Sequence, residues 1–517
     1  MTRWHWVTLL AVLFVVPGNF AATKPQWICA ESKDFAVVSD ATEKDTRLLA
    51  VRLEAFRSVL SRIFGLRRNS DRPLTVMAFR DWESFRDVES YGLAIGEFMD
   101  RGAEDIVIMV MLNQKGIDPE QTLLHEYTHV LTSTSIHDWP PWLREGIAEV
   151  YSTFKIDGNK VILGLPIESR LTAVRNEASL IPTTSLIKQA PKGHDVWNAP
   201  LFYAQAWALS HYLMFAEKRV YADKLFEYAR RCEAGKDSEQ IFREVFQTDP
   251  KTFDKKLADY IRQQEFPGLT IEYDNLSFDK ELKVHPLSEA DLDACYGNIL
   301  LNATDYERRH DFRSIKNEEK FKVDPRHRAE VYFRDALKRD PKCARAYEGY
   351  AFLNMLRENY KVAQQQYRDA LKLRPDHAES HYLFAMALYG DYAGFYDYAK
   401  EIPPDQAADI FEEARTALKL KPTYADCYDV FARLCLNPGE SLDEGLRLID
   451  SAIHANPRTY LFQLTRGELL YRKGDYVAAR KALTTLIEDD ENVPYKVRAS
   501  AQRILDQVQS DEHRVKH

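Results

Sequence analysis

The stretch "IDPEQTLLHEYTHVL", residues 117–131, decides how the first half of the chain is interpreted. Asp118 is a good helix N-cap, Pro119 suits the first helical position and Gln121 the third, so the sequence predicts that a helix begins here. His125 and His129 then lie one turn apart, about 6 Å along the helix axis. Two imidazoles at this spacing, with a glutamate beside the first, can point toward one ion.

Two histidines supply half of a zinc site. Zinc takes nitrogen or oxygen donors in a tetrahedron with one position left for water, and a nearby carboxylate can take the proton that the metal acidifies. Since the chain has 14 histidines in 517 residues, such a motif arises by chance in roughly one chain in fifty. The next predicted helix, "WLREGIAEVYSTF" (142–154), supplies Glu145 as a third ligand. We expect Glu149, one turn later, to accept the free N–H of a liganding histidine.

These two motifs together resemble a known group of enzymes. HEYTH followed by W-L-x-E-G-x-A-E is similar to the gluzincin zinc metallopeptidases, which are also called peptidase MA-like and form the thermolysin/aminopeptidase N superfamily. The resemblance implies that His125, His129 and Glu145 bind one Zn²⁺ and that Glu126 activates water. It therefore implies a hydrolase that cleaves peptides or proteins.

Two further segments resemble parts of the same group. "FYAQAWALSHYL" (202–213) is similar to the helix that follows the zinc site in aminopeptidase-like members, which implies that Tyr203 donates a hydrogen bond to the tetrahedral oxyanion. The alternative is that Tyr203 is a packed aromatic residue of an amphipathic helix. "EDIVIMVML" (104–112) precedes the zinc helix as the substrate-binding edge strand does. The G-A-M-E-N signature of the aminopeptidases is absent, which favours an endopeptidase.

The first 22 residues, "MTRWHWVTLLAVLFVVPGNFAA", have the pattern of a secretory signal peptide. Arg3 lies near the start, an apolar run spans residues 6–16, and small residues follow at Ala21 and Ala22. About eleven apolar residues are too few for a bilayer core of roughly 30 Å. We therefore expect export to the periplasm or the medium, with no stable membrane span after cleavage. An N-terminal membrane anchor is the alternative.

Composition excludes other classes of protein. A net charge of −9 and the lack of a basic stripe argue against nucleic acid as a partner. The six cysteines show no CxxC spacing, so the sequence indicates neither a disulfide scaffold nor a cysteine zinc site.

The C-terminal part contains an internal repeat. Pro341 and Pro375 lie 34 residues apart, and Pro422 and Pro457 lie 35 apart, which matches the period of the tetratricopeptide repeat. A small-large-small pattern precedes two of these prolines, as Ala363, Tyr367 and Ala370 and as Ala329, Phe333 and Ala336. The pattern predicts four to five repeats, with one enlarged loop around "GDYAGFYDYAKEIPP" (390–404) on which a partner could dock.

The sequence therefore predicts a multidomain chain, α/β followed by all-α. The expected parts are a signal peptide (1–22), a gluzincin-like α+β zinc metallopeptidase domain (23–270), a linker (271–290) and a helical tetratricopeptide-repeat solenoid (291–510). The expected function is that of an exported zinc peptidase whose repeats bind a protein partner or substrate. Two alternatives stay open: a catalytically silent, zinc-containing scaffold that acts through its repeats, and a hydrolase for a bond other than the peptide bond.

Overall fold

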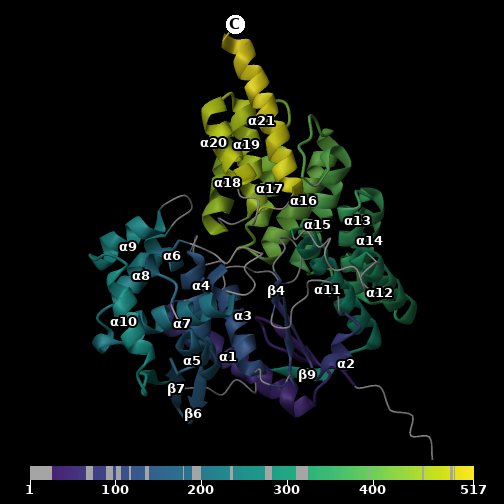
Figure 1. The fold of residues 1–517 in the computed structure, drawn as a ribbon. Coiled ribbons are helices and arrows are strands. Elements are labelled where there is room, and N and C mark those ends of the chain that lie inside the picture. The colour runs from purple at the N-terminus through teal and green to yellow at the C-terminus, as the bar shows by residue number, and fades with distance from the viewer. Residues whose placement is uncertain are drawn as a thin grey trace, which may run out of the picture.

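The fold is that of a computed structural model of the chain (Figure 1). The described residues are 26–65, 74–88, 97–99, 106–113, 115, 118–133, 139–177, 180–188, 199–232, 237–273, 282–309, 324–394, 396–456, 459–488, 493 and 495–516. The predicted signal peptide, residues 1–22, lies outside them. None of the helices in these ranges combines the length and the apolar character that a membrane crossing requires.

A six-stranded sheet organises the N-terminal part. Its strands lie in the order β4-β5-β3-β2-β1-β9, with β2, β3 and β5 parallel and the other three antiparallel to their neighbours. The bounds are β1 Ile28–Glu31, β2 Ala36–Ser39, β3 Leu74–Phe79, β4 Glu97–Met99, β5 Ile106–Met111 and β9 Lys283–Pro286. The residues of β2, β3 and β5 are mostly apolar, as is typical of interior strands.

Both faces of this sheet are buried, because its side chains alternate between two cores. On one face, residues such as Val76 and Ile108 pack against α1 (Glu43–Phe64) and α3 (Pro119–Ser133). On the other face, residues such as Met77 and Met109 pack against α11 (Glu289–Arg309), with α2 (Trp82–Phe85) beside it. The predicted zinc helix therefore lies on one face, and the first helix of the C-terminal array covers the other.

A second, helical unit follows α3. It contains a hairpin of β6 (Lys155–Asp157) and β7 (Lys160–Leu163), turned at Gly158 with φ 60°, and β8 (Leu269–Glu272) completes a three-stranded sheet. Its helices are α4 Pro141–Ser152, α5 Glu168–Asn176, α6 Thr183–Leu186, α7 Ala199–Phe215, the 3₁₀ helix η1 Glu217–Arg219, α8 Ala222–Arg231, α9 Ser238–Phe246 and α10 Thr252–Ile261.

The C-terminal part is an array of paired helices that rises from the sheet and ends in the projecting helix α21 (Figure 1). Successive helices pack as pairs, and each odd-numbered helix also contacts the next odd-numbered one, which forms the inner wall of a solenoid. After α11 the bounds are α12 Pro325–Arg339, α13 Ala344–Leu356, α14 Tyr360–Leu373, α15 Ala378–Ala393, α16 Pro404–Leu420, α17 Asp426–Leu434, α18 Leu442–Ala455, α19 Tyr460–Lys473, α20 Tyr476–Glu488 and α21 Tyr495–Lys516.

The segment predicted as a linker, residues 271–290, is not an unpaired connection. It contains the end of β8, and β9 pairs with β1 in the large sheet. Both strands are only four residues long and largely exposed, so they carry little of the apolar pattern that reveals a strand in sequence.

The enlarged loop of the array is partly buried. Residues 396–403 fold back onto the inner wall, where the Tyr398 hydroxyl lies 2.9 Å from Thr465 Oγ1 of α19 and the Arg433 guanidinium of α17 lies over the Tyr398 ring. Ala399 and Ile402 are buried. Part of this loop therefore packs against the array itself, whereas Lys400, Glu401 and Pro403 are exposed, and docking of a partner on the loop stays a prediction.

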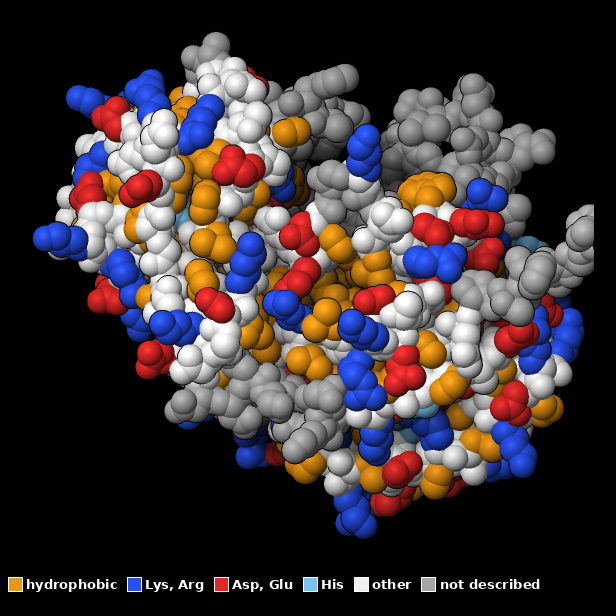
Figure 2. Space-filling view, turned by 90° about the horizontal axis from the view of Figure 1, so that it is seen from below, with side chains coloured by type: hydrophobic (Ala, Val, Ile, Leu, Met, Phe, Trp, Pro, Cys, Tyr) orange, Lys and Arg blue, Asp and Glu red, His pale blue; other side chains and the backbone are white. Residues whose placement is uncertain are grey.

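Surface charge agrees with the composition. On the face seen from below, acidic and basic side chains alternate over the described residues without a basic stripe (Figure 2).

Candidate metal centre

Helix α3 begins where the sequence predicts and presents its histidines on one side. The Asp118 carboxylate accepts hydrogen bonds from the backbone N–H groups of Glu120 and Gln121, at 3.0 and 3.2 Å. One helical turn then separates His125 from His129, whose Nε2 atoms lie 3.1 Å apart. Both side chains are largely buried, at 15% and 14% exposure.

A third ligand atom comes from helix α4. Glu145 Oε2 lies 3.4 Å from His125 Nε2 and 3.3 Å from His129 Nε2, so three ligand atoms form a nearly equilateral triangle. An unprotonated imidazole nitrogen and a carboxylate oxygen are both hydrogen-bond acceptors. Three such atoms can lie this close together only if they share protons or bind a cation. Two nitrogens and one oxygen are also a donor set that zinc takes in open sites. The residues therefore fit a zinc ion.

Charge within this cluster is strongly coupled. Burial alone would lower the pKa of His125, but its hydrogen bond with Glu145 and the charges of Glu149 and Glu126 raise that pKa to about 9. Burial would likewise raise the pKa of Glu145, but the charge of His129 and hydrogen bonds from both histidines hold it well below its usual range. The surrounding carboxylates thus give the cluster an environment that favours positive charge at its centre.

Glu149 lies behind His125, as the sequence predicts for a residue that orients a ligand. Its Oε1 is 3.6 Å from His125 Nδ1 and 2.6 Å from Arg170 Nη2 of α5, and its side chain is only 3% exposed. Because Nδ1 faces Glu149, Nε2 is left for the ion. Arg170 offsets the charge of the buried carboxylate and holds it in place.

A close contact between α4 and α7 brings Tyr203 to the site. A Cβ atom at Gly146 would lie 2.1 Å from Ser210 Oγ and 2.4 Å from the Ala206 carbonyl oxygen, so only glycine permits this approach. Tyr203 lies on the same face of α7, one turn before Ala206. The centroid of its ring lies 5.7 Å from the Arg170 Cζ atom.

Tyr203 and Glu126 both lie near this cluster, as their mutual charge effects indicate. Burial, and after it the charges of Glu145, Glu126 and Glu149, raise the pKa of Tyr203 to about 12, so its hydroxyl keeps its proton at neutral pH. The charge of Glu126 acts on both His125 and Tyr203. All six residues singled out in the sequence therefore lie around one centre.

The sheet edge near this centre differs from the expectation. β5 pairs with β3 on one side and with β4 on the other, so β5 is an interior strand and β4 is the edge among the described residues. An extended peptide therefore cannot add to β5 at residues 107–109, where β4 already pairs with it, and binding of a peptide beyond these residues stays a prediction.

Arg170 is the residue of this site that sequence reasoning missed. It lies 21 residues after Glu149, beyond the β6–β7 hairpin, and no local motif marks it. A buried glutamate needs a cation nearby, and this is the only reason to expect an arginine here. The sequence contains many arginines, so this reason does not identify Arg170.

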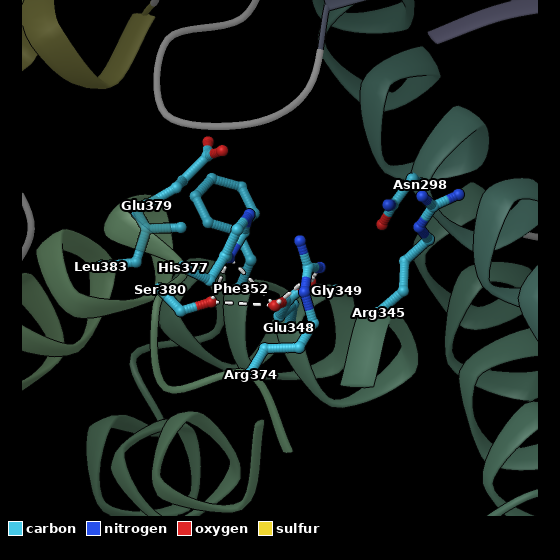
Figure 3. A pocket seen from close by; sticks show the side chains of 10 residues that line it. All are labelled: Asn298, Arg345, Glu348, Gly349, Phe352, Arg374, His377, Glu379, Ser380 and Leu383. Atoms are coloured by element: carbon cyan, nitrogen blue, oxygen red, sulfur yellow. Dashed lines mark hydrogen bonds and ion pairs between the residues drawn. The ribbon is translucent and has the colours of Figure 1, made fainter. Parts of the chain in front are cut away.

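A hollow lies on the inner wall of the array, where α11, α13 and α15 meet (Figure 3). Glu348 lies at its centre, with hydrogen bonds from Arg374 Nη1 at 3.1 Å and from Ser380 Oγ at 3.0 Å. Arg345, Phe352 and Leu383 also line it. The hollow thus offers apolar surface and charges of both signs.

Comparisons with known proteins concern the array. Residues 439–494 match the tetratricopeptide repeat family. A structure titled as the functional characterization of Pseudomonas aeruginosa pilF is 16% identical, with a TM-score of 0.29, over 44% of this chain and 98% of that chain. A thermophilic tetratricopeptide-repeat protein of Thermus thermophilus is 16% identical, with a TM-score of 0.30, over 36% of this chain and 94% of that chain.

YrrB, titled a tetratricopeptide-repeat protein with an unusual peptide-binding site, is 18% identical, with a TM-score of 0.25, over 40% of this chain and 97% of that chain. No curated protein matches the chain. The C-terminal part therefore contains tetratricopeptide repeats, which suggests that it binds protein.

Proposed function

We propose that the protein is an exported zinc-dependent peptidase of the gluzincin type, and that its repeats bind a protein partner or the substrate. The observation that carries this proposal is the triangle of His125, His129 and Glu145, with Glu126 and Tyr203 beside it. The ligands come from two separate helices. A chance H-E-x-x-H sequence would not by itself bring a third ligand from another helix to the two histidines. The sequence pattern of residues 1–22 is the reason for proposing export.

The chain's own residues suit hydrolysis of a peptide bond. Zn²⁺ bound by His125, His129 and Glu145 would supply a Lewis acid that polarises a carbonyl group and acidifies water. Glu126 would take a proton from the attacking water and deliver it to the leaving amine. Tyr203 keeps its proton at neutral pH and can donate a hydrogen bond to the oxygen on which negative charge develops.

We propose that the array holds a protein segment for this centre. Its inner wall is covered by residues 396–403 at α17, α19 and α21, where Asp397 Oδ1 accepts a hydrogen bond from Ser500 at 3.2 Å. The hollow between α11, α13 and α15 remains accessible at the other end. We propose that this hollow is where the repeats engage a partner.

The test compares cleavage of a mixed peptide library by the wild type and by Glu126→Gln. The variant should keep a full equivalent of zinc and lose cleavage, because only the base has been changed. Glu120→Gln is the matched control, since Glu120 is on the same helix but pairs with Arg52 at 3.2 Å, away from the ligands, and it should cleave normally. A wild type that holds zinc and cuts nothing in the library would refute the peptidase and favour the silent scaffold.

A further inference from the structure

A second group of ligand-type side chains lies on the large sheet, on the face covered by α11. Cys29 and Glu31 are two residues apart on β1, so they point to the same face, and His285 is directly opposite Cys29 on β9. Their ligand atoms lie within 4.8 Å of one another. None of the three takes part in the centre described above.

The distances within this group are those of ligands around a shared ion. Glu31 Oε1 lies 3.9 Å from Cys29 Sγ and 3.7 Å from His285 Nε2. Tetrahedral zinc, with bonds of about 2.0 Å to nitrogen or oxygen and about 2.3 Å to sulfur, separates its ligand atoms by roughly 3.3–3.6 Å. The two distances from Glu31 are therefore slightly wider than those between bound ligands, and the Cys29 and His285 ligand atoms lie within 4.8 Å of each other.

The hydrogen bond of His285 shows which nitrogen faces the group. Its Nδ1 lies 3.0 Å from the Pro286 carbonyl oxygen, which can only accept, so Nδ1 carries a proton. In neutral imidazole Nε2 is then an acceptor, and it faces a carboxylate that is also an acceptor. Histidine ligands of metals characteristically donate their other N–H to a carbonyl or carboxylate. Two acceptors that face each other in this way are stabilised by a shared proton or by a metal cation between them.

We propose that Cys29, Glu31 and His285 form a second zinc site, which fastens β9 to β1 at the point where the chain enters the repeat array. One sulfur, one nitrogen and one oxygen are donors that zinc accepts together, and a water molecule completes the tetrahedron. A thiolate, a carboxylate and a neutral imidazole carry two negative charges, which balance Zn²⁺.

Proton balance gives the site a further property. Cys29 Sγ donates to Glu31 Oε1 at 3.9 Å, so the sulfur carries a proton when no metal is bound. Binding of Zn²⁺ forms the zinc–sulfur bond, breaks the S–H bond and releases one proton to solvent. Arg345 donates to the neighbouring Cys295 sulfur at 3.1 Å, and its charge also favours the Cys29 thiolate.

The position of these three residues in the fold indicates what a zinc ion bound there would stabilise. β9 is an edge strand of four residues that leads directly into α11, and most of its side chains are exposed. A strand this short gains little from its own packing. A metal bridge to β1 would fix this junction.

Cobalt substitution tests the proposal independently of the peptidase, because a thiolate bound to Co²⁺ gives a near-ultraviolet charge-transfer band that a centre of histidines and glutamate cannot give. The full-length wild type should take up two equivalents of Co²⁺ and show the band. His129→Ala should take up one equivalent and keep the band. Cys29→Ser should lose it, whereas Cys232→Ser, which removes a buried thiol elsewhere, should not.

The outcomes separate the two centres. A wild type without the band, or a band that survives in Cys29→Ser, overturns the second site whatever the state of the first. If Cys29→Ser fails to fold, His285→Gln replaces it, since this side chain is 47% exposed. That variant should bind the second Co²⁺ at least 10-fold more weakly in a chelator competition, and an unchanged affinity would also overturn the proposal.

Discussion

Replacing Gly146 by alanine should damage catalysis through the packing of two helices. The added Cβ would lie 2.4 Å from the Ala206 carbonyl oxygen, and an ordinary contact begins at 3.4 Å, so α4 and α7 must separate by 3.4 − 2.4 = 1.0 Å. The Ser210 hydroxyl can rotate away, but the carbonyl is fixed in the backbone of α7. Overpacking of this kind costs about 1–3 kcal/mol, which the better helix propensity of alanine offsets by about 1 kcal/mol.

The expected net loss is therefore up to about 2 kcal/mol, measured as a fall in the thermal midpoint of up to roughly 8 °C. Activity should fall much further, because α4 carries Glu145 and α7 carries Tyr203, and a displacement of about 1 Å at reacting groups costs about 10²-fold in rate. Zinc content should stay at one equivalent in this centre, since its three ligands lie on α3 and α4.

Gly158→Ala is the control for this experiment. Gly158 has φ 60°, and a Cβ added there would meet no atom within 4 Å, so alanine costs only backbone strain, about 1–2 kcal/mol. It should lower the midpoint by a similar amount and leave kcat/KM unchanged. If Gly146→Ala instead kept full activity, the close approach of α4 and α7 would not be what positions Tyr203.

Three further variants probe single contacts of the same region. Tyr203→Phe should lower kcat by about 10²–10³-fold with zinc content and KM unchanged, because it removes one donor to the developing charge; steady-state kinetics would expose an unaltered kcat. Arg170→Met leaves the Glu149 carboxylate buried without its ion pair, so zinc affinity should fall about 10–100-fold in a chelator titration; equal affinities would limit Arg170 to a packing role. Burial lowers the pKa of His211 to about 4, so below pH 6.5 the unfolded chain takes up a proton that the folded chain refuses, and stability should decrease by about 3 kcal/mol as the pH falls from 6.5 to 4. Urea unfolding of His211→Gln should lack this part of the pH dependence, and an identical slope would count against it.

The elements that could be predicted are those with a strong local pattern. The interior strands β3 and β5 are continuous apolar runs, and α3 has a capping aspartate followed by proline, so sequence alone indicates their type and place. The edge strands β4, β8 and β9 are three or four residues long. Their residues pair with partners distant in the chain, and nothing local reports such pairing.

The same distinction holds for the residues of the candidate centre and of the proposed second site. His125, Glu126, His129, Glu145 and Glu149 lie on two consecutive helices, where residue spacing determines which side chains share a face. Arg170 comes from a helix beyond the hairpin, and His285 lies 254 residues after Glu31 in the chain. Only the tertiary fold brings these side chains to their partners, so residue spacing could not reveal them.

Helix α11 belongs to two structures at once, because it opens the repeat array and also covers one face of the large sheet. Tyr296 and Ile299 pack in the same core as Phe79 and Met109, and the Trp27 and Tyr296 rings meet edge to face at 5.8 Å. A chain cut near residue 275 would leave that face of the sheet open to water and prone to aggregation. The part that carries the histidines is therefore not a module that can be excised or exchanged, and the shortest autonomous fragment must include the beginning of the array.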